Sequence, residues 1–326
     1  MACERGTGIT RRTVIGGAAA LLVTLAGCGL RLDRDPEVPE LSTADEVRNT
    51  VARILARTEA EGADAEVVDA LAAAVGPEWA PPTELVTPTP TSGPDAYSGP
   101  DGLFAAAEAI VTQFDDLDSM HAVLADVAVG AVLHLQQSGD DRVDELLQTM
   151  SEVPADRPEA DPSAGPGEDS EAPAEEDGEA DPQQQALTTF AVACYQASYS
   201  YERAAALVGD DDPTRTVLTT RITELDVAAD LANERLADRG FAAAENRPAW
   251  QVDPDPAEAG AQTAGAAYED ALVEALGPLF DPAVRAPRLG LASLWQTAAT
   301  RAALGQPQAL RFDIAASPSA SPLMEG

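Results

Sequence analysis

Three cysteines are the side chains of this chain best suited to covalent chemistry. Cys28 follows two small residues, Ala26 and Gly27, which fit the narrow cleft of a signal peptidase. A thiol at such a point can accept acyl chains, and two or more acyl chains hold a protein firmly on a membrane. Cys3 lies upstream, so Cys194 would be the one thiol besides Cys28 in the processed chain. With a single thiol left over, stability must come from a packed core and not from disulfides.

The segment before Cys28 has the order of a secretory signal. Arg11 and Arg12 precede an apolar run, Val14 to Gly27, that contains no ionisable residue. Its 14 residues are fewer than the roughly 20 that a helix needs to cross a membrane, which favours a signal over a permanent span. The paired arginines resemble a twin-arginine export signal, which is read by a receptor.

The end of the apolar run resembles a bacterial lipobox, because residues 25–28 read Leu-Ala-Gly-Cys. We therefore expect a signal peptide over residues 1–27, acylation of Cys28 and a tether over residues 28–41. The expected location is the outer face of the cytoplasmic membrane. The alternative is a simple N-terminal anchor in which the cysteine has no role.

The charge of the chain limits its partners. The formal net charge is −36, and every one of the 20 basic residues is arginine. Residues 1–27 carry three arginines and one acid, so the mature chain would have a charge of −38. Such a body is repelled by phosphate backbones and by anionic lipid headgroups. We expect no nucleic-acid partner, and we expect contact with the membrane only through the lipid on Cys28.

The remaining polar residues do not form a recognisable catalytic or metal site. His121 and His134, the only histidines, are 13 residues apart and would lie on nearly opposite faces of one helix. The acidic clusters at 115–118 and 210–212 lack the spacing of a calcium loop and suit helix caps and turns. No Gly-x-Ser-x-Gly, phosphate-binding loop or Cys-x-x-Cys is present. We predict no catalytic residue, metal or cofactor.

Apolar residues recur with a helical period in two separate parts of the chain. The helices that they predict must position the residues named above. The N-terminal helical region covers residues 42–151 and begins with a capping box at residues 43–46. Its helices are expected at about 43–60, 63–75, 101–137 with a break near 115–118, and 141–150. Residues 152–182 hold twelve acids and six prolines, so this linker should stay disordered.

In the C-terminal region, residues 183–306, the spacing of apolar residues predicts four amphipathic helices. Four such helices favour an antiparallel four-helix bundle. Asp212 and Pro213 mark the start of its second helix. Residues 307–326 should form a flexible tail. The inward positions of the second helix are predicted to be Leu218, Ile222, Leu225, Ala229, Ala232 and Leu236.

One thiol and several aromatic residues of this bundle could line a cavity for a small apolar ligand. The simpler interpretation of Cys194 is a small buried hydrophobe, and the alternative is a redox-active or ligand-facing thiol. The candidate cavity residues are Cys194, Tyr199, Tyr201, Tyr268 and Trp295.

The order of these features resembles the ferritin-like lipoproteins of high-GC Gram-positive bacteria. The resemblance rests on the signal and lipobox, on Val75-Gly76-Pro77-Glu78-Trp79 after the N-terminal helices, and on the alanine-rich helices of residues 185–305. It covers most of the chain, and its motifs are mainly Tyr201 and the Arg/Leu/Ala pattern of the second helix. The resemblance implies a ferritin-like fold for the C-terminal region; this family brings no demonstrated activity.

A di-iron centre in such a bundle needs a Glu on each of two helices and Glu-x-x-His on each of the other two. This chain has no Glu-x-x-His, and residues 283–304 contain no Asp, Glu or His. Cys194 and Tyr195 stand where the resembling family often has Glu-His. We therefore expect a ferritin-like domain without metal.

Three functions remain open on the sequence. The first is a lipid-anchored, non-catalytic interaction or scaffold module with unidentified envelope proteins as partners. The second is an extracytoplasmic binding protein for a small apolar ligand held between helices. The third, an oxidoreductase, follows from fold analogy alone.

Overall fold

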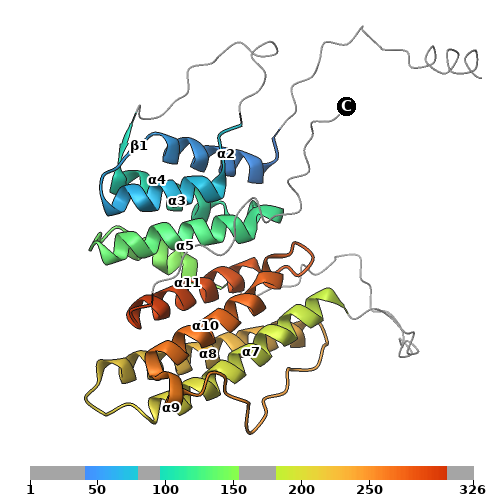
Figure 1. Cartoon of the computed structure of the whole chain (residues 1–326). Helices are drawn as coiled ribbons and strands as arrows, with labels where there is room; N and C mark the ends of the chain where they lie inside the picture. The colour runs from blue at the N-terminus through green and yellow to red at the C-terminus, as the bar shows by residue number, and fades with distance from the viewer. Residues whose placement is uncertain (1–40, 80–95, 154–180, 307–326) are drawn as a thin grey trace, which may run out of the picture. The chain divides into compact units, whose positions relative to one another are not determined.

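The computed structural model describes residues 41–79, 96–153 and 181–306. Within these ranges the protein is almost wholly helical, with ten α-helices and one pair of two-residue strands (Figure 1). This confirms the all-α prediction. The signal, Cys28 and most of the tether, the acidic segment 154–180 and the tail lie outside the described residues.

The N-terminal helical region contains five α-helices. A serine, not the predicted threonine, caps the first of them: the Ser42 hydroxyl accepts from the Asp45 N–H at 3.1 Å. Two short 3₁₀ turns, η1 (Phe114–Asp116) and η2 (Asp118–Met120), form the predicted break. The helices are α2 (Thr43–Ala56), α3 (Ala63–Val75), α4 (Gly99–Thr112), α5 (His121–Gln137) and α6 (Val143–Ser151). The strands β1 (Thr58–Glu59) and β2 (Tyr97–Ser98) pair in parallel.

Helix α5 is the centre of this region. It packs against α3, α4 and α6, and most of its side chains are buried. The stretch Asp118–Gln137 is the one described helical segment long and apolar enough to cross a membrane, but 61% of its apolar window is buried inside the protein. A helix that is apolar on all sides is also what a core position requires.

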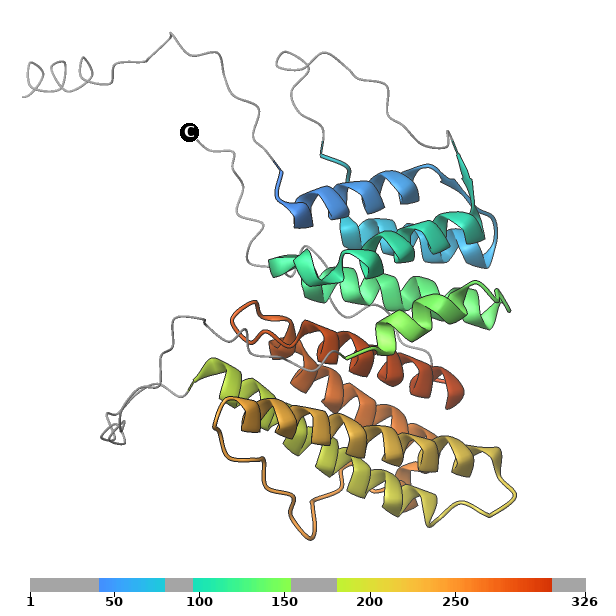
Figure 2. The ribbon, with the colours of Figure 1, turned by 180° about the vertical axis from the view of Figure 1, so that it is seen from behind.

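The C-terminal region begins with two long helices capped alike. The carboxylates of Asp181 and Asp212 accept backbone N–H groups, and a proline occupies the first turn of each helix. The elements are α7 (Pro182–Ala205), α8 (Pro213–Asp238), α9 (Pro256–Ala259), α10 (Ala261–Leu276), the 3₁₀ turn η3 (Gly277–Phe280) and α11 (Pro287–Ala303). Helix α7 packs on α8 and α10, and α11 packs on the same two helices (Figure 2).

Helix α11 also contacts the N-terminal helices, a question that the sequence leaves open. It packs on α5 and α6, and Arg288 at its start forms two hydrogen bonds to the Asp115 carboxylate, at 2.7 and 2.9 Å. The Arg288 guanidinium lies over the Phe114 ring, 5.4 Å from its centroid. All described helices belong to one compact unit and share one buried apolar core.

Candidate functional site

A buried ion pair lies between α8 and α10. Arg221 is 2% exposed and Glu269 is fully buried. The Arg221 Nε donates to Glu269 Oε1 at 2.8 Å, and its Nη2 donates to Oε2 at 2.9 Å. This two-point geometry is the strongest way in which a guanidinium binds a carboxylate.

The other two long helices each add a hydroxyl to this pair. The Tyr201 hydroxyl, from α7, donates to Glu269 Oε1 at 2.6 Å, and Thr297 Oγ1, from α11, accepts from Arg221 Nη2 at 3.1 Å. Both residues are buried. We call Tyr201, Arg221, Glu269 and Thr297 the central network. Each of the four helices supplies one member.

Burial and mutual charge set the protonation of the central network. Burial acts to lower the pKa of Arg221, but attraction to Glu269 outweighs it and the net pKa is raised. Burial, followed by the charge of Glu269, raises the pKa of Tyr201 well above 10. The network therefore holds a guanidinium cation and a neutral phenol that donates its proton in a hydrogen bond. Such groups are suited to fixing helix register.

The thiol beside the network is inert. Cys194 is 1% exposed, and burial raises its pKa to about 12. The space that it lines with Arg221 and Thr297 is too small for a water molecule. A buried thiol with a raised pKa is neither a good nucleophile nor a ready redox sensor, which agrees with the simpler interpretation of Cys194.

The five predicted cavity residues do not gather around one described cavity. Tyr201 belongs to the central network, and Tyr268 contacts its ring edge-on, with centroids 5.5 Å apart. Tyr268 also lines a surface groove, whereas Cys194 faces the closed space described above. Trp295 is 8% exposed and Tyr199 is half-buried. A single cavity lined by all five residues therefore stays a prediction.

That groove runs between α7 and α10 and has a volume of about 360 Å³. Its α7 wall spans Thr189 to Ser200, and its α10 wall spans Tyr268 to Ala275. Asp253, from the long connection between α8 and α9, completes the lining. The wall residues are mostly small, so two helices that pack together along their length still leave room here for a small molecule.

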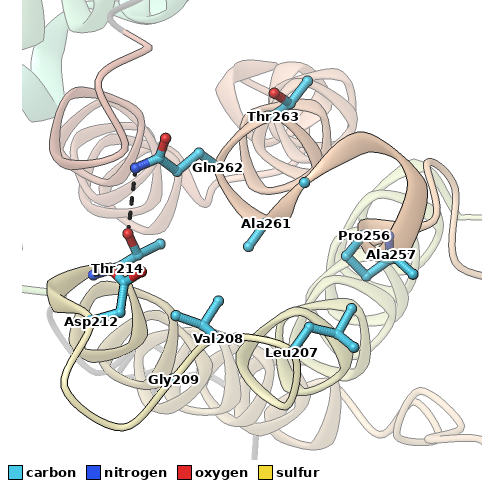
Figure 3. A pocket seen from close by; sticks show the side chains of 11 residues that line it. Leu207, Val208, Gly209, Asp212, Thr214, Pro256, Ala257, Ala261, Gln262 and Thr263 are labelled. Carbon is cyan, nitrogen blue, oxygen red and sulfur yellow. Dashed lines mark hydrogen bonds between the residues drawn. The ribbon is translucent and has the colours of Figure 1, made fainter.

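A second, wider cavity of about 600 Å³ lies where α7 ends and α8 and α10 begin (Figure 3). Leu207 and Val208 form its apolar side, and Gln262 donates to Thr214 Oγ1 across it at 3.4 Å. Leu207 is 57% exposed. The cavity is open, and none of its polar lining side chains is buried.

The two histidines lie apart and have different surroundings. His134 Nε2 is 2.7 Å from Asp64 Oδ1 near the surface. His121 is buried against the edge of Phe114, and its Nδ1 is bonded to the Asp118 carbonyl, but its Nε2 has no hydrogen-bond partner. Burial lowers the pKa of His121. In the described part of the chain, no three His, Cys, Asp or Glu side chains are placed to hold a metal ion.

The central network contains the residues that the sequence prediction missed. Arg221 is buried on α8, whereas the predicted inward residue Ile222 is only half-buried. Arg221 lies three residues after Leu218 and four before Leu225, so its spacing places it on the apolar face of α8. Glu269 follows Tyr268 directly and is also buried on α10. An arginine and a glutamate at apolar-face positions of two helices, Arg221 and Glu269, are the sequence pattern that could have indicated this ion pair.

Comparisons with protein-family models, with curated proteins and with solved structures found no match. The function must therefore be argued from the residues themselves.

Proposed function

We propose that this chain is an exported protein held by acyl chains on Cys28 at the outer face of the cytoplasmic membrane, where it acts as a non-catalytic interaction or scaffold module. The observation that carries the proposal is the lipobox at residues 25–28 behind the apolar run and the pair Arg11 and Arg12. Acylation of the Cys28 thiol would explain why an export signal precedes this cysteine directly.

The proposed architecture of the C-terminal region is a ferritin-like four-helix bundle of α7, α8, α10 and α11. In the ferritin-like bundles that bind two irons, the inward acids and histidines face a pair of metal ions. Here the inward acid Glu269 is bound by the guanidinium of Arg221 at 2.8 Å. A metal ion would have to displace that cation, which supports a structural role for the bundle interior.

The charge of the body supports a role that depends on anchorage. A formal net charge of −36 disfavours contact with phosphate backbones and anionic headgroups, so the lipid on Cys28 supplies the attachment. The body would then stand off the bilayer and present its surface to other envelope proteins.

Membrane partitioning of a cysteine variant tests the anchor. We expect the wild-type chain, expressed with its own signal in a lipoprotein-processing bacterium, to enter the membrane fraction and the detergent phase. Cys28→Ser should leave that phase, and the matched control Cys194→Ser should remain in it. Equal partitioning of Cys28→Ser and the wild type would contradict the anchor.

Crosslinking in intact cells tests the scaffold role. We expect a defined envelope protein to be crosslinked to the wild-type chain and lost with Cys28→Ser, which changes the attachment and leaves the folded body intact. The same set of crosslinks from both chains would contradict a role that depends on being held at the membrane.

A second candidate function, an extracytoplasmic binding protein, is favoured by the groove between α7 and α10. Its volume of about 360 Å³ lies within the range of small-molecule sites, and Tyr268 is part of its wall. Native mass spectrometry of the protein purified from its source tests this function. A bound small molecule, released on denaturation, is expected; a mass equal to that of the acylated chain alone would contradict it.

A further inference from the structure

The groove between α7 and α10 has an apolar floor and an acidic mouth. Ala193 and Ala197 of α7 face Leu272 and Ala275 of α10, and three of these four side chains are buried. Alanines keep the floor wide, because a larger side chain at any of these positions would fill it. A compact apolar group fits against such a floor.

The mouth carries two carboxylates. Asp253 and Glu274 both line the groove and both are exposed. No arginine belongs to the lining. Burial and then the charge of Asp255 raise the pKa of Tyr268 to about 12, while the charge of Arg203 acts to lower it. Arg203 lies beyond Ser200, where the α7 wall ends.

The connection that carries Asp253 is fixed to both walls. Gln196 Nε2, on α7, donates to the Gln251 carbonyl at 3.3 Å. The Tyr268 hydroxyl, on α10, donates to the Pro254 carbonyl at 2.9 Å. These bonds hold the backbone on either side of Asp253, so its carboxylate is positioned at the groove and does not belong to a free loop.

We propose that this groove binds a small organic cation, a quaternary or tertiary ammonium whose alkyl groups contact the alanine floor and whose charge lies near Asp253 and Glu274. The inference rests on the second candidate function and names its ligand class. Carboxylates attract the charge, and a tetraalkylammonium has the compact apolar shape that the floor accepts. A neutral apolar ligand would leave the two carboxylates unused, and an anion would be repelled by them.

A matched pair of probes separates charge from shape. Choline and its neutral isostere 3,3-dimethylbutan-1-ol have nearly the same size, and each is titrated into the ¹⁵N-labelled full chain while amide shifts are followed. We expect choline to shift residues of α7 and α10 around the groove, and to bind at least ten times more tightly than the isostere.

Two pairs of variants locate the site. Asp253→Asn with Glu274→Gln should weaken choline binding about tenfold. The control pair Asp230→Asn with Glu234→Gln removes the same charge from exposed positions of α8 and should change it less than twofold. Ala271→Phe, at an exposed position of the groove wall, should block binding while the chain stays folded by circular dichroism.

The outcomes distinguish the ligand class from the binding function. Equal affinity of choline and its isostere for the groove would overturn the cation inference and leave the binding function standing. No shift in the groove with either probe would overturn both. Equal weakening by the two charge pairs would show attraction to the whole acidic surface and would also overturn the inference.

Discussion

The interior of α7, α8, α10 and α11 differs from the interior around α5. The first contains the central network, in which one side chain from each helix must find its partner at hydrogen-bonding distance. The second is filled mainly by Val, Leu and Ala, although His121 and Asp126 of α5 are buried there too. The stability of the first interior depends mainly on hydrogen-bonded side-chain pairs, and that of the second mainly on the close packing of apolar side chains. Loss of a single group should therefore have different consequences in the two regions.

Breaking the ion pair should give the largest effect. Glu269→Leu removes the two-point carboxylate partner of the buried Arg221 guanidinium and leaves the weaker contact of its Nη1 with Glu224, at 3.3 Å. We expect a loss of about 3–5 kcal/mol in the free energy of unfolding. The control is Arg221→Met with Glu269→Leu, which removes both charges and should recover most of the stability. Denaturant unfolding measures both. A single variant as stable as the wild type would contradict the pairing.

Removing a large apolar side chain from the interior around α5 should give a comparable or smaller loss. Leu124 is fully buried on α5, and Leu124→Ala should reduce the free energy of unfolding by about 2–5 kcal/mol. The exposed variant Leu207→Ala is the control and should change it by less than about 0.5 kcal/mol. Denaturant unfolding by circular dichroism follows both. A Leu124→Ala loss no larger than that of the control would argue against an α5 core position.

The contact between the two regions should contribute less. Arg288→Ala removes two hydrogen bonds to Asp115 and the contact with the Phe114 ring. Because the Asp115 side chain is 65% exposed, solvent screens the pair, and we expect a loss of about 1 kcal/mol. Hydrogen exchange should show the change at residues 114–120 and at the start of α11. Unchanged exchange at both places would contradict the contact.

The smallest effect should be a pH dependence that comes from His121. Burial lowers the pKa of His121 below its ordinary value of 6.5. Below that pH the unfolded chain takes up a proton that the folded chain resists, so the free energy of unfolding contributed by His121 falls as the pH is lowered. The difference in stability between the wild type and His121→Gln should therefore narrow between pH 7.5 and 5.5. A pH-independent difference would show that His121 is not buried in its neutral form.

Local features of the helices can be predicted from the sequence, whereas the contacts between helices cannot. Helix caps and helix breaks depend on residues that are close in the sequence. Asp212 and Pro213 therefore predict the start of α8, and residues 115–118 predict the break before α5; the structure confirms both. The central network is not local. Arg221 and Glu269 are 48 residues apart, and each looks like an ordinary surface charge until two helices bring them together.

The sequence also leaves open how the two helical regions meet. An acidic stretch marked a boundary at residues 152–182, but helix α11 packs on α5 and α6 as well as on α8 and α10. The amino-acid composition of a segment can predict a boundary between helical regions. It does not predict which helix faces pack against one another. The surroundings of single side chains are equally non-local: Tyr201 and Tyr268 are neighbours, yet Tyr201 belongs to the central network and Tyr268 to the wall of the groove.

Mass spectrometry of the N-terminal peptide shows directly whether Cys28 is acylated. The chain is purified from the membranes of cells that express it with its own signal, and is then digested and measured. We expect the first peptide to begin at Cys28 and to carry a diacylglyceryl group on its sulfur. A peptide that runs through residues 25–28 with an unmodified Cys28 would contradict this prediction.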